Sequence, residues 1–453
     1  MTVLRLHNTL TREKEAFAPL DASNIRVYAC GPTVYDRIHI GNARPIVVFD
    51  VLVRLLRHLY PKVTYVRNIT DVDDKIIARA SERGISIGEL CETTITNFHA
   101  DIEALGALPP DHEPRATEFV DEMIDMISDL IAKGHAYEAE GHVLFSVKTM
   151  PEYGGLSQRS MDDMIAGARV EVAPYKRDAA DFILWKPSND DQPGWSNPFS
   201  STKGRPGWHI ECSAMARHYL GHEFDIHAGG LDLIFPHHEN EIAQSCCAHD
   251  TKIMAKYWLH NGFVTMGEEK MSKSLGNLIM AGEAIAAHRG ETVRAALLAA
   301  HYRAPVALPD TAMTEAKNVL DRLYRAVAGV NTSADAVDDV FVAALADDLN
   351  TPAAMARLHE LASAANKGDK DAAVALKSSS ALLGLLEQNA DEWAKQAGSA
   401  ESLDDALIET KIEARITARR ERNFALADQI RDELAEAGVV LEDGPEGTIW
   451  RRG

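Results

Sequence analysis

Short apolar segments alternate with amphipathic segments through the first third of the chain, and this alternation restricts the possible folds most. Residues 25–29 and 63–68 are rich in β-branched and aromatic residues, which is typical of buried strands. Residues 45–59 and 72–83 have the apolar periodicity of helices. This order predicts a Rossmann-like parallel α/β sheet, whose ligands bind beyond the carboxyl ends of its strands.

An insertion is predicted to interrupt this pattern. A helix over 115–133 precedes a hairpin over 136–147 that turns at Glu140-Gly141, and residues 187–206 are rich in proline, glycine and aspartate. The α/β pattern then resumes with a helix, a strand and a helix, over 209–219, 224–228 and 236–248. Pro236 suits the first turn of the last helix, because a donor is not needed there.

The chain changes character after Asn277, where long helical runs rich in alanine and leucine begin. Residues 347–352 are a helix-start signal, and a linker near 398–400 precedes a tail with two short strands around residues 443–445. We therefore expect an all-helical domain and a small mixed α/β C-terminal domain after the Rossmann-like domain. The expected limits are 1–120 and 207–262 for the two Rossmann-like halves, 121–206 for the insertion, 263–310 for the connecting region, 311–397 for the helical domain and 398–453 for the C-terminal domain.

The net charge of −21 argues against a protein that binds nucleic acid through a broad basic surface. A local basic patch is compatible with this charge. Five basic residues recur at helical spacing near the C-terminus: Lys411, Arg415, Arg419, Arg420 and Arg422. Because glutamates lie between them, an exposed helix covered by ion pairs is the second interpretation.

The cysteines and the apolar runs indicate the compartment. Five cysteines, an odd number at scattered positions, argue against a disulfide framework and indicate a reducing environment. No apolar run reaches the roughly 18 residues of a membrane span, and residues 2–15 contain no signal-type apolar block. We therefore expect a cytoplasmic protein without a membrane partner.

Two segments far apart in the sequence carry chemistry suited to a nucleotide. His39-Ile40-Gly41-Asn42 lies at a predicted helix entrance, where backbone N–H groups and the helix dipole favour anions. Lys270-Met271-Ser272-Lys273-Ser274 offers two cations and two hydroxyls to a polyphosphate. The two commonest glycine-rich phosphate loops do not occur in the sequence, so ATP must be held another way. Each segment taken alone also fits an ordinary turn or loop-to-helix join.

Taken together, the two segments resemble the signatures of the class I aminoacyl-tRNA synthetases, His-Ile-Gly-His and Lys-Met-Ser-Lys-Ser. The resemblance implies activation of a carboxylate by ATP with Mg²⁺. It implies catalytic roles for His39, Asn42, Lys270 and Lys273, and contacts to ATP from Gly41, Ser272, Lys273 and Ser274. Asn42 departs from the signature, because its amide donates a hydrogen bond but does not titrate, which puts any protonation role of this position in doubt.

Four other residues have side chains that bind zinc: Cys30, Cys212, His237 and Glu241. His237 and Glu241 are four residues apart and share a helix face, whereas the two cysteines are far apart in the sequence. The spacing therefore leaves two interpretations open, a metal site and buried free cysteines. His238 and Glu239 are expected to support the ligands or to lie on the surface.

Longer stretches resemble the cysteinyl-tRNA synthetases, at residues 30–35, 67–75, 207–215, 235–241 and 442–452. The resemblance implies one zinc ion per chain, held by Cys30, Cys212, His237 and Glu241, to which the thiolate of L-cysteine binds. It implies that cysteine and ATP form cysteinyl-adenylate and pyrophosphate, and that cysteine then passes to the 3′-terminal ribose of tRNA(Cys). In this interpretation residues 263–310 contain the signature loop and contact the tRNA stem.

A zinc ion would explain how the protein distinguishes cysteine from serine. An apolar pocket separates near-isosteres such as cysteine and serine by only about 1–3 kcal/mol, whereas zinc prefers a thiolate to a hydroxyl. Two thiolates and a carboxylate already exceed the charge of the ion, so we hypothesise that Glu241 is a displaceable ligand. The hypothesis requires that Glu241→Ala change the absorption spectrum of the cobalt-substituted protein, either free or with cysteine bound.

The remaining site residues follow from the same resemblance. Thr70, Trp208 and Asp232 are expected to contact the amino acid, although Trp208 also fits a structural role. The candidates for contact with unpaired anticodon bases are Arg419, Phe424, Asp428, Asp443 and Trp450. Phe424 and Trp450 would serve equally well in a small core.

Three other functions compete with cysteine–tRNA ligation. A cysteine ligase of the mycothiol pathway would use the same activation with an amino-sugar acceptor, but such ligases lack the C-terminal tail. A zinc hydrolase would need a cluster such as H-E-x-x-H, which residues 237–241 do not match. A non-catalytic RNA-binding module would leave the nucleotide signatures without a purpose. A monomer is expected.

Overall fold

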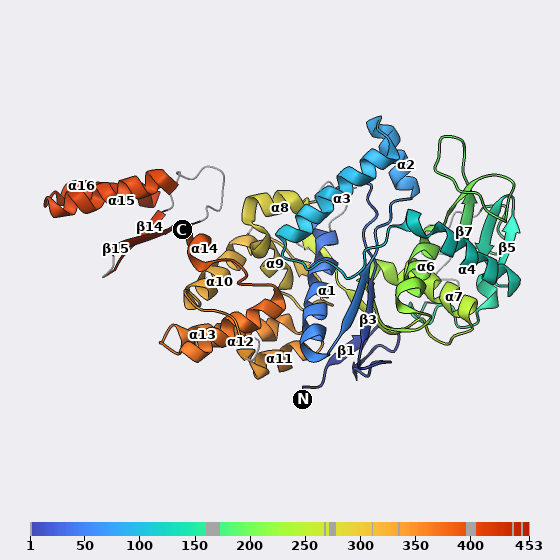
Figure 1. The fold of residues 1–453 in the computed structure, drawn as a ribbon, viewed down its shortest axis with the longest axis horizontal. Coiled ribbons are helices and arrows are strands. Elements are labelled where there is room, and N and C mark those ends of the chain that lie inside the picture. Colours follow the sequence, from blue (N-terminus) through green and yellow to red (C-terminus); the bar gives the residue numbers. More distant parts are fainter. Residues whose placement is uncertain are drawn as a thin grey trace.

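A parallel four-stranded sheet forms the centre of the molecule (Figure 1). The computed structural model describes residues 2–159, 173–266, 269–270, 278–309, 311–333, 336–395, 405–436, 439–444 and 447–452. The sheet order is β10-β9-β3-β4, with β10 at Ala255–Asn261, β9 at Phe224–Gly230, β3 at Ile25–Ala29 and β4 at Val63–Arg67. The predicted Rossmann-like parallel sheet is confirmed.

Helices cover both faces of this sheet, because side chains alternate along each strand. Val27 packs in one apolar core with α1 (Ile40–Leu59), and Tyr28 packs in a second core with α6 (Trp208–Leu220). The first face is also covered by α8 (Ala281–His288) and α9 (Gly290–Leu298), and the second by α4 (Val120–Ala132) and α7 (Glu239–His249). Figure 1 shows α1 and α6 on opposite sides of the strands.

The insertion forms its own antiparallel sheet next to α4. Its order is β5-β6-β7-β8, at Ala136–Ala139, His142–Phe145, Phe182–Pro187 and Gly204–Pro206. The predicted hairpin turn is present, since Glu140 and Gly141 both have positive φ values of 49° and 78°. The helix predicted over 115–133 is divided into a 3-10 turn, Ala116–Phe119, and α4.

The first core continues into a bundle of helices. This bundle contains α10 (Ala312–Ala326), α11 (Asp339–Ala346), α12 (Thr351–Ala365), α13 (Lys370–Ser380) and α14 (Ala390–Lys395). Asn350 caps α12 by accepting a hydrogen bond from the N–H of Ala353, as the helix-start signal predicted. Two further helices, α2 (Asp74–Arg83) and α3 (Ile87–Ala104), follow β4.

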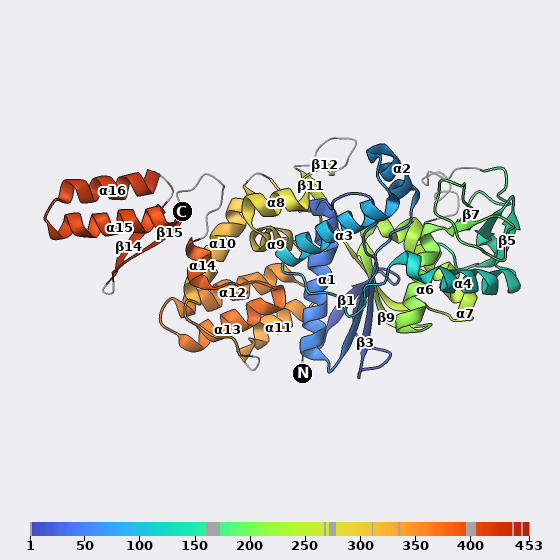
Figure 2. The ribbon, with the colours of Figure 1, turned by 45° about the horizontal axis from the view of Figure 1, so that its top comes forward.

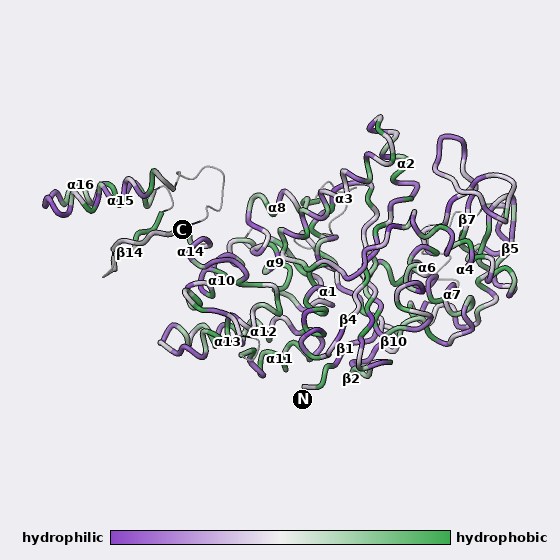
Figure 3. The backbone as a smooth tube through the Cα atoms, in the orientation of Figure 1, coloured by the Kyte–Doolittle hydropathy of each residue, from purple (hydrophilic) through white to green (hydrophobic). Residues whose placement is uncertain are grey.

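The C-terminal part is a small separate unit at the end of the molecule, visible in Figures 1 and 2. It contains a helix pair, α15 (Asp405–Arg420) and α16 (Phe424–Glu436), and a hairpin, β14 (Val439–Gly444) and β15 (Gly447–Arg452). Hydrophobic and hydrophilic stretches alternate along the helix pair (Figure 3), and its core includes Ile412, Leu434 and Trp450.

Three small features complete the chain. A hairpin of β1 (Arg5–Asn8) and β2 (Glu13–Ala16) precedes β3. A second small sheet has the order β12-β11-β13, at Glu269–Lys270, Val264–Met266 and Val306–Ala307 (Figure 2). No helix in the described part of the chain is long and apolar enough to cross a membrane.

Two helix starts differ from the prediction. Helix α1 begins at Ile40, five residues before Pro45, because the side chain of His39 caps it and a proline near the N-terminal end removes only one backbone hydrogen bond. The helix predicted from Pro236 instead begins as α7 at Glu239, after a kinked turn over Ile234–His238 in which Phe235 has an extended backbone. As a result, His39 caps α1, and His237 and His238 lie in the turn before α7.

A buried ion pair fastens α1 to α9. The carboxylate of Asp50 accepts from Arg294, whose side chain is fully buried, from Arg54 and from the N–H of Leu108. Removing one member of such a pair leaves an uncompensated buried charge, so we expect Asp50→Asn to lower the free energy of unfolding by about 3 kcal/mol. Thermal and urea denaturation measure this. Glu82→Gln, which alters an exposed ion pair with Arg79, should change it by less than about 1 kcal/mol, and equal effects would contradict the argument.

Candidate active site and metal centre

The candidate site lies at the carboxyl end of the central sheet, where β3 and β9 are neighbours. The chain leaves β3 towards β4 on one side, and β9 lies on the other side, so this is a topological switch point where such sheets bind ligands. A cleft of about 470 Å³ opens there. Its lining includes His39, Gly41 and Asn42 from the entrance of α1, Cys30 after β3, Trp208, and Asp232 after β9.

The entrance of α1 is organised by His39. Its Nδ1 accepts a hydrogen bond from the N–H of Gly41 at 3.1 Å, and the side-chain oxygen of Asn42 accepts from the N–H of His39 at 3.4 Å. A neutral imidazole that accepts at Nδ1 carries its proton on Nε2, which makes Nε2 the donor. A Cβ atom at position 41 would lie 2.9 Å from the ring of His39, so a larger residue there would displace the ring.

The second nucleotide signature is only partly described. The backbone of Lys270 belongs to β12, which pairs with β11, and β11 follows the cleft residues Gly262 and Phe263. Ser272, Lys273 and Ser274 lie outside the described residues. Their roles stay predictions.

The four predicted metal ligands come together beside the cleft. Ligand atoms of Cys30, Cys212, His237 and Glu241 all lie within 4.8 Å of one another. The two sulfur atoms are 3.8 Å apart, and Glu241 Oε1 lies 3.6 Å from Cys30 Sγ and 3.0 Å from His237 Nε2. Apart from Cys30, which is partly exposed, these residues are buried. Residues far apart in the sequence therefore form one donor cluster.

This donor set fits zinc. Two zinc–sulfur bonds of about 2.3 Å at a tetrahedral angle place the sulfurs about 3.8 Å apart, which matches the separation of Cys30 and Cys212. Burial, together with Cys212 and Glu241, raises the pKa of the Cys30 thiol well above its usual value, and burial lowers the pKa of His237 to about 3. The imidazole is therefore neutral and able to bind a metal, and a divalent cation would offset the cost of ionising the thiol.

A second set of four ligands shares two residues with the first: Cys30, His227, His238 and Glu241 also lie within 4.8 Å of one another. His227 Nε2 is 2.9 Å from Glu241 Oε2, and His238 Nε2 is 3.3 Å from Cys30 Sγ. His227 is not among the predicted ligands, although a histidine in a buried strand is a usable signal. His238 and Glu239 are both buried, which excludes the surface alternative and leaves the expectation that they support the ligands.

The loop after β3 packs directly on the end of β4. The N–H of Gly31 donates to the side chain of Asn68 at 2.9 Å, and a Cβ atom at position 31 would lie 1.6 Å from the carbonyl oxygen of Asn68. Only glycine allows this approach. The contact fixes the position of Cys30, which with Glu241 is common to both ligand sets.

Of the three predicted contacts to the amino acid, two line the cleft and one is buried. Trp208 lines the cleft, is 37% exposed, and stacks on His237 with ring centroids 4.1 Å apart. Asp232 also lines the cleft. Thr70 is buried behind it, and its hydroxyl donates to Glu211 at 2.8 Å.

The predicted anticodon contacts also differ in exposure. Phe424 is 61% exposed, and Arg419 and Asp428 are exposed as well. Trp450 is 8% exposed and belongs to the small C-terminal core, which was its alternative interpretation. Asp443 lies in β14, and its side chain is outside the described residues.

The basic residues of α15 do not form one exposed row. Arg415 is buried, whereas Arg419 and Arg420 are exposed. Lys411 pairs with Glu433 of α16 at 2.5 Å, so it joins the two helices. The ion-paired interpretation therefore fits Lys411.

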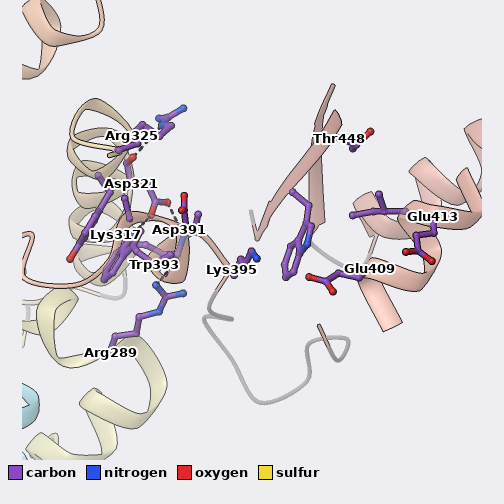
Figure 4. A pocket seen from close by; sticks show the side chains of 16 residues that line it. Arg289, Lys317, Asp321, Arg325, Asp391, Trp393, Lys395, Glu409, Glu413 and Thr448 are labelled. Carbon is purple, nitrogen blue, oxygen red and sulfur yellow. Dashed lines mark hydrogen bonds and ion pairs between the residues drawn. The ribbon is translucent and has the colours of Figure 1, made fainter. Parts of the chain in front are cut away.

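A second cavity of about 800 Å³ lies between the helical bundle and the C-terminal unit (Figure 4). Trp393 lies on the bundle side, between Tyr324, whose ring stacks on it at 4.5 Å, and the guanidinium of Arg289. Glu409 and Glu413 of α15 lie on the other side. The lining contains acidic and basic side chains in similar number, which does not define one class of ligand.

Comparison with known proteins covers nearly the whole chain. Three family profiles match: "tRNA synthetases class I (C) catalytic domain" at residues 16–318, "DALR domain" at 340–390, and "Cysteinyl-tRNA ligase anticodon binding domain" at 405–451. The cysteine–tRNA ligase of Rhodospirillum rubrum is 57% identical, with 99% of each chain covered. That of Acidiphilium cryptum is 55% identical, with 100% of each chain covered.

Solved structures support the fold. Methionyl-tRNA synthetase of Mycobacterium tuberculosis, in complex with methionyl-adenylate, superposes with a TM-score of 0.58 at 16% identity, over 82% of this chain and 93% of that one. The leucyl enzyme of Agrobacterium radiobacter, in a ternary complex with tRNA, gives a TM-score of 0.56 at 11% identity, over 83% and 85%. The family profiles and the full-length relatives show that the chain belongs to the cysteine–tRNA ligases, a family of class I aminoacyl-tRNA synthetases.

Proposed function

We propose that this aminoacyl-tRNA ligase activates L-cysteine with ATP to cysteinyl-adenylate and pyrophosphate, and then transfers cysteine to the 3′-terminal ribose of tRNA(Cys). One observation carries the proposal. A single cleft is lined by the helix entrance that suits ATP and by Cys30 of the thiol-containing cluster. An amino acid whose sulfur lies at the cluster can therefore present its carboxylate to a nucleotide at the helix entrance.

The chain supplies hydrogen-bond donors for the activation step. The Nε2–H of His39 and the amide of Asn42 would donate to oxygens of the α-phosphate as negative charge builds there during in-line attack. Lys270 and Lys273 would offset the charge of the departing pyrophosphate. Asn42 acts in this scheme as a fixed donor, because an amide neither gives up nor takes a proton.

The cluster would provide recognition of the side chain. Zinc held by Cys30, Cys212, His237 and Glu241 would supply a Lewis acid that prefers a thiolate to a hydroxyl. We favour this ligand set over the one with His227 and His238 because it contributes two soft sulfur ligands. His227 then holds the second oxygen of Glu241, and the stacked ring of Trp208 fixes His237. Asp232, which lines the cleft, would accept from the ammonium group of the amino acid.

The C-terminal part supports tRNA as the acceptor. The profile match at residues 405–451 is to an anticodon-binding domain, which an amino-sugar acceptor would not require. We assign Arg419, Phe424 and Asp428 as the contacts to anticodon bases, because all three are exposed. The competing function, a cysteine ligase of the mycothiol type, has less support.

The test is aminoacylation of tRNA(Cys) with cysteine and with serine, before and after removal of metal by a chelator. We expect charging with cysteine that is lost on chelation and recovers with zinc, and serine charging lower by about 10⁴-fold. Cysteine-dependent exchange between ATP and pyrophosphate without tRNA charging would favour the amino-sugar ligase. Full activity without a bound metal, or equal charging with serine, would overturn the proposal.

A further inference from the structure

Arg44 is a buried charge without a counter-ion. It is the fifth residue of α1, its side chain is fully buried, and its donors reach only backbone carbonyl oxygens. One terminal nitrogen donates to Phe263 at 2.8 Å, and the other to Ala304 at 2.7 Å and His301 at 3.3 Å. Within the described residues no carboxylate pairs with Arg44, and its Nε has no partner.

Other deeply buried arginines are neutralised differently. Arg294 is also fully buried and pairs with Asp50, and Arg67 is 2% exposed and pairs with Glu113 at 2.8 Å. Arg44 has the less favourable surroundings, since it lies near the positive end of α1, whose first turn contains no acidic residue. Burial lowers the pKa of Arg44 to about 10, so the guanidinium is still charged at neutral pH.

The position of this charge relates it to the cleft. Residues on both sides of Arg44 in the sequence line the cleft, namely Asn42, Pro45 and Ile46, and so does its acceptor residue Phe263. Arg44 does not line the cleft itself. Arg44 therefore contacts the wall of the cleft at the carbonyl oxygen of Phe263, without lining the cleft itself.

We propose that Arg44 is a positioning residue for ATP: its guanidinium holds the wall at Phe263 against the entrance of α1, and its charge is balanced by the triphosphate when ATP binds. The inference rests on the proposed function, since it takes the nucleotide to lie at His39 and Asn42. A buried cation in a medium of low dielectric attracts an anion beyond the wall more strongly than a solvated cation does. The attraction grows with the charge of the nucleotide.

The test compares the affinities of ATP, ADP, AMP and adenosine for the full-length protein by calorimetry. Arg44→Met removes the charge and keeps a similar length, so we expect ATP affinity to fall about tenfold and adenosine affinity by less than about twofold. Arg44→Lys keeps the charge but loses the planar guanidinium with its several donors, so its ATP affinity should stay within about threefold of that of the unsubstituted protein. Leu52→Ala is the control, because it weakens the packing of α1 without changing any charge, and should shift the affinities of all four nucleotides equally.

A purely structural role for Arg44 predicts a different result. If Arg44→Met lowered the affinities for ATP and for adenosine by the same factor, or lowered neither affinity, the proposal would be overturned. If Arg44→Met does not fold, Arg44→Lys decides: ATP affinity within threefold of the unsubstituted protein supports the proposal, and a tenfold loss overturns it. Failure of the proposed function is a separate outcome, because the unsubstituted protein would then show no cysteine-dependent exchange of pyrophosphate whatever the variants bind.

Discussion

Replacing Cys212 with serine is expected to lower cysteine-dependent exchange between ATP and pyrophosphate by about 10³-fold. The substitution would exchange a soft ligand for a hard one in the proposed zinc site, where Cys212 Sγ lies 3.8 Å from Cys30 Sγ. Loss of a bound Lewis acid removes several kcal/mol of stabilisation, and about 4 kcal/mol corresponds to this factor. The protein should also purify with less than stoichiometric zinc, measured by mass spectrometry of the metal.

Cys246→Ser is the matched control for this substitution. Cys246 is 8% exposed, close to the burial of Cys212, but it belongs to neither set of candidate metal ligands. We expect Cys246→Ser to retain its zinc and to keep its exchange activity within about threefold, apart from a small loss of stability. If Cys212→Ser instead kept both the exchange rate and the preference for cysteine over serine, the assignment of the cluster would be wrong.

Much of the fold could be predicted because it depends on local patterns. The strands β3 and β4, the hairpin turn at Glu140-Gly141 and the start of α12 each carry their signal within a few residues. The start of α1 was placed five residues late, because proline usually marks a helix start and histidine is an uncommon cap. Strands of two to four residues, such as β1 and β13, are too short to show a period.

The candidate site could be predicted only in part, because its geometry depends on contacts between distant segments. Spacing alone left Cys30 and Cys212 open to two interpretations, and the resemblance to known synthetases supplied the ligand set. The structure adds His227 and His238, which reach the same cluster from β9 and the turn before α7. Arg44 was missed for a different reason: its acceptors are backbone carbonyls, which no side-chain pattern reveals.

The second large prediction concerns the helix entrance. His39→Asn is expected to lower the rate of cysteine activation by about 10² to 10³-fold, with little change in KM for cysteine. Asparagine caps helices well, so its oxygen can accept from the N–H of Gly41 as Nδ1 does now at 3.1 Å. Its side chain is too short, however, to place a donor where Nε2 lies. Pre-steady-state formation of cysteinyl-adenylate measures the step directly.

Two variants separate the loss of the donor from damage to the helix. His39→Ala removes both the cap and the donor, so it should lose about as much rate as His39→Asn and in addition about 1 kcal/mol of stability. Gly41→Ala keeps both groups but puts a methyl 2.9 Å from the ring of His39, which must rotate away. Because alanine favours the helix more than glycine does, this variant should lose activity, by about tenfold or more, without losing stability. A His39→Asn protein that forms the adenylate within threefold of the normal rate would show that the imidazole is only a cap.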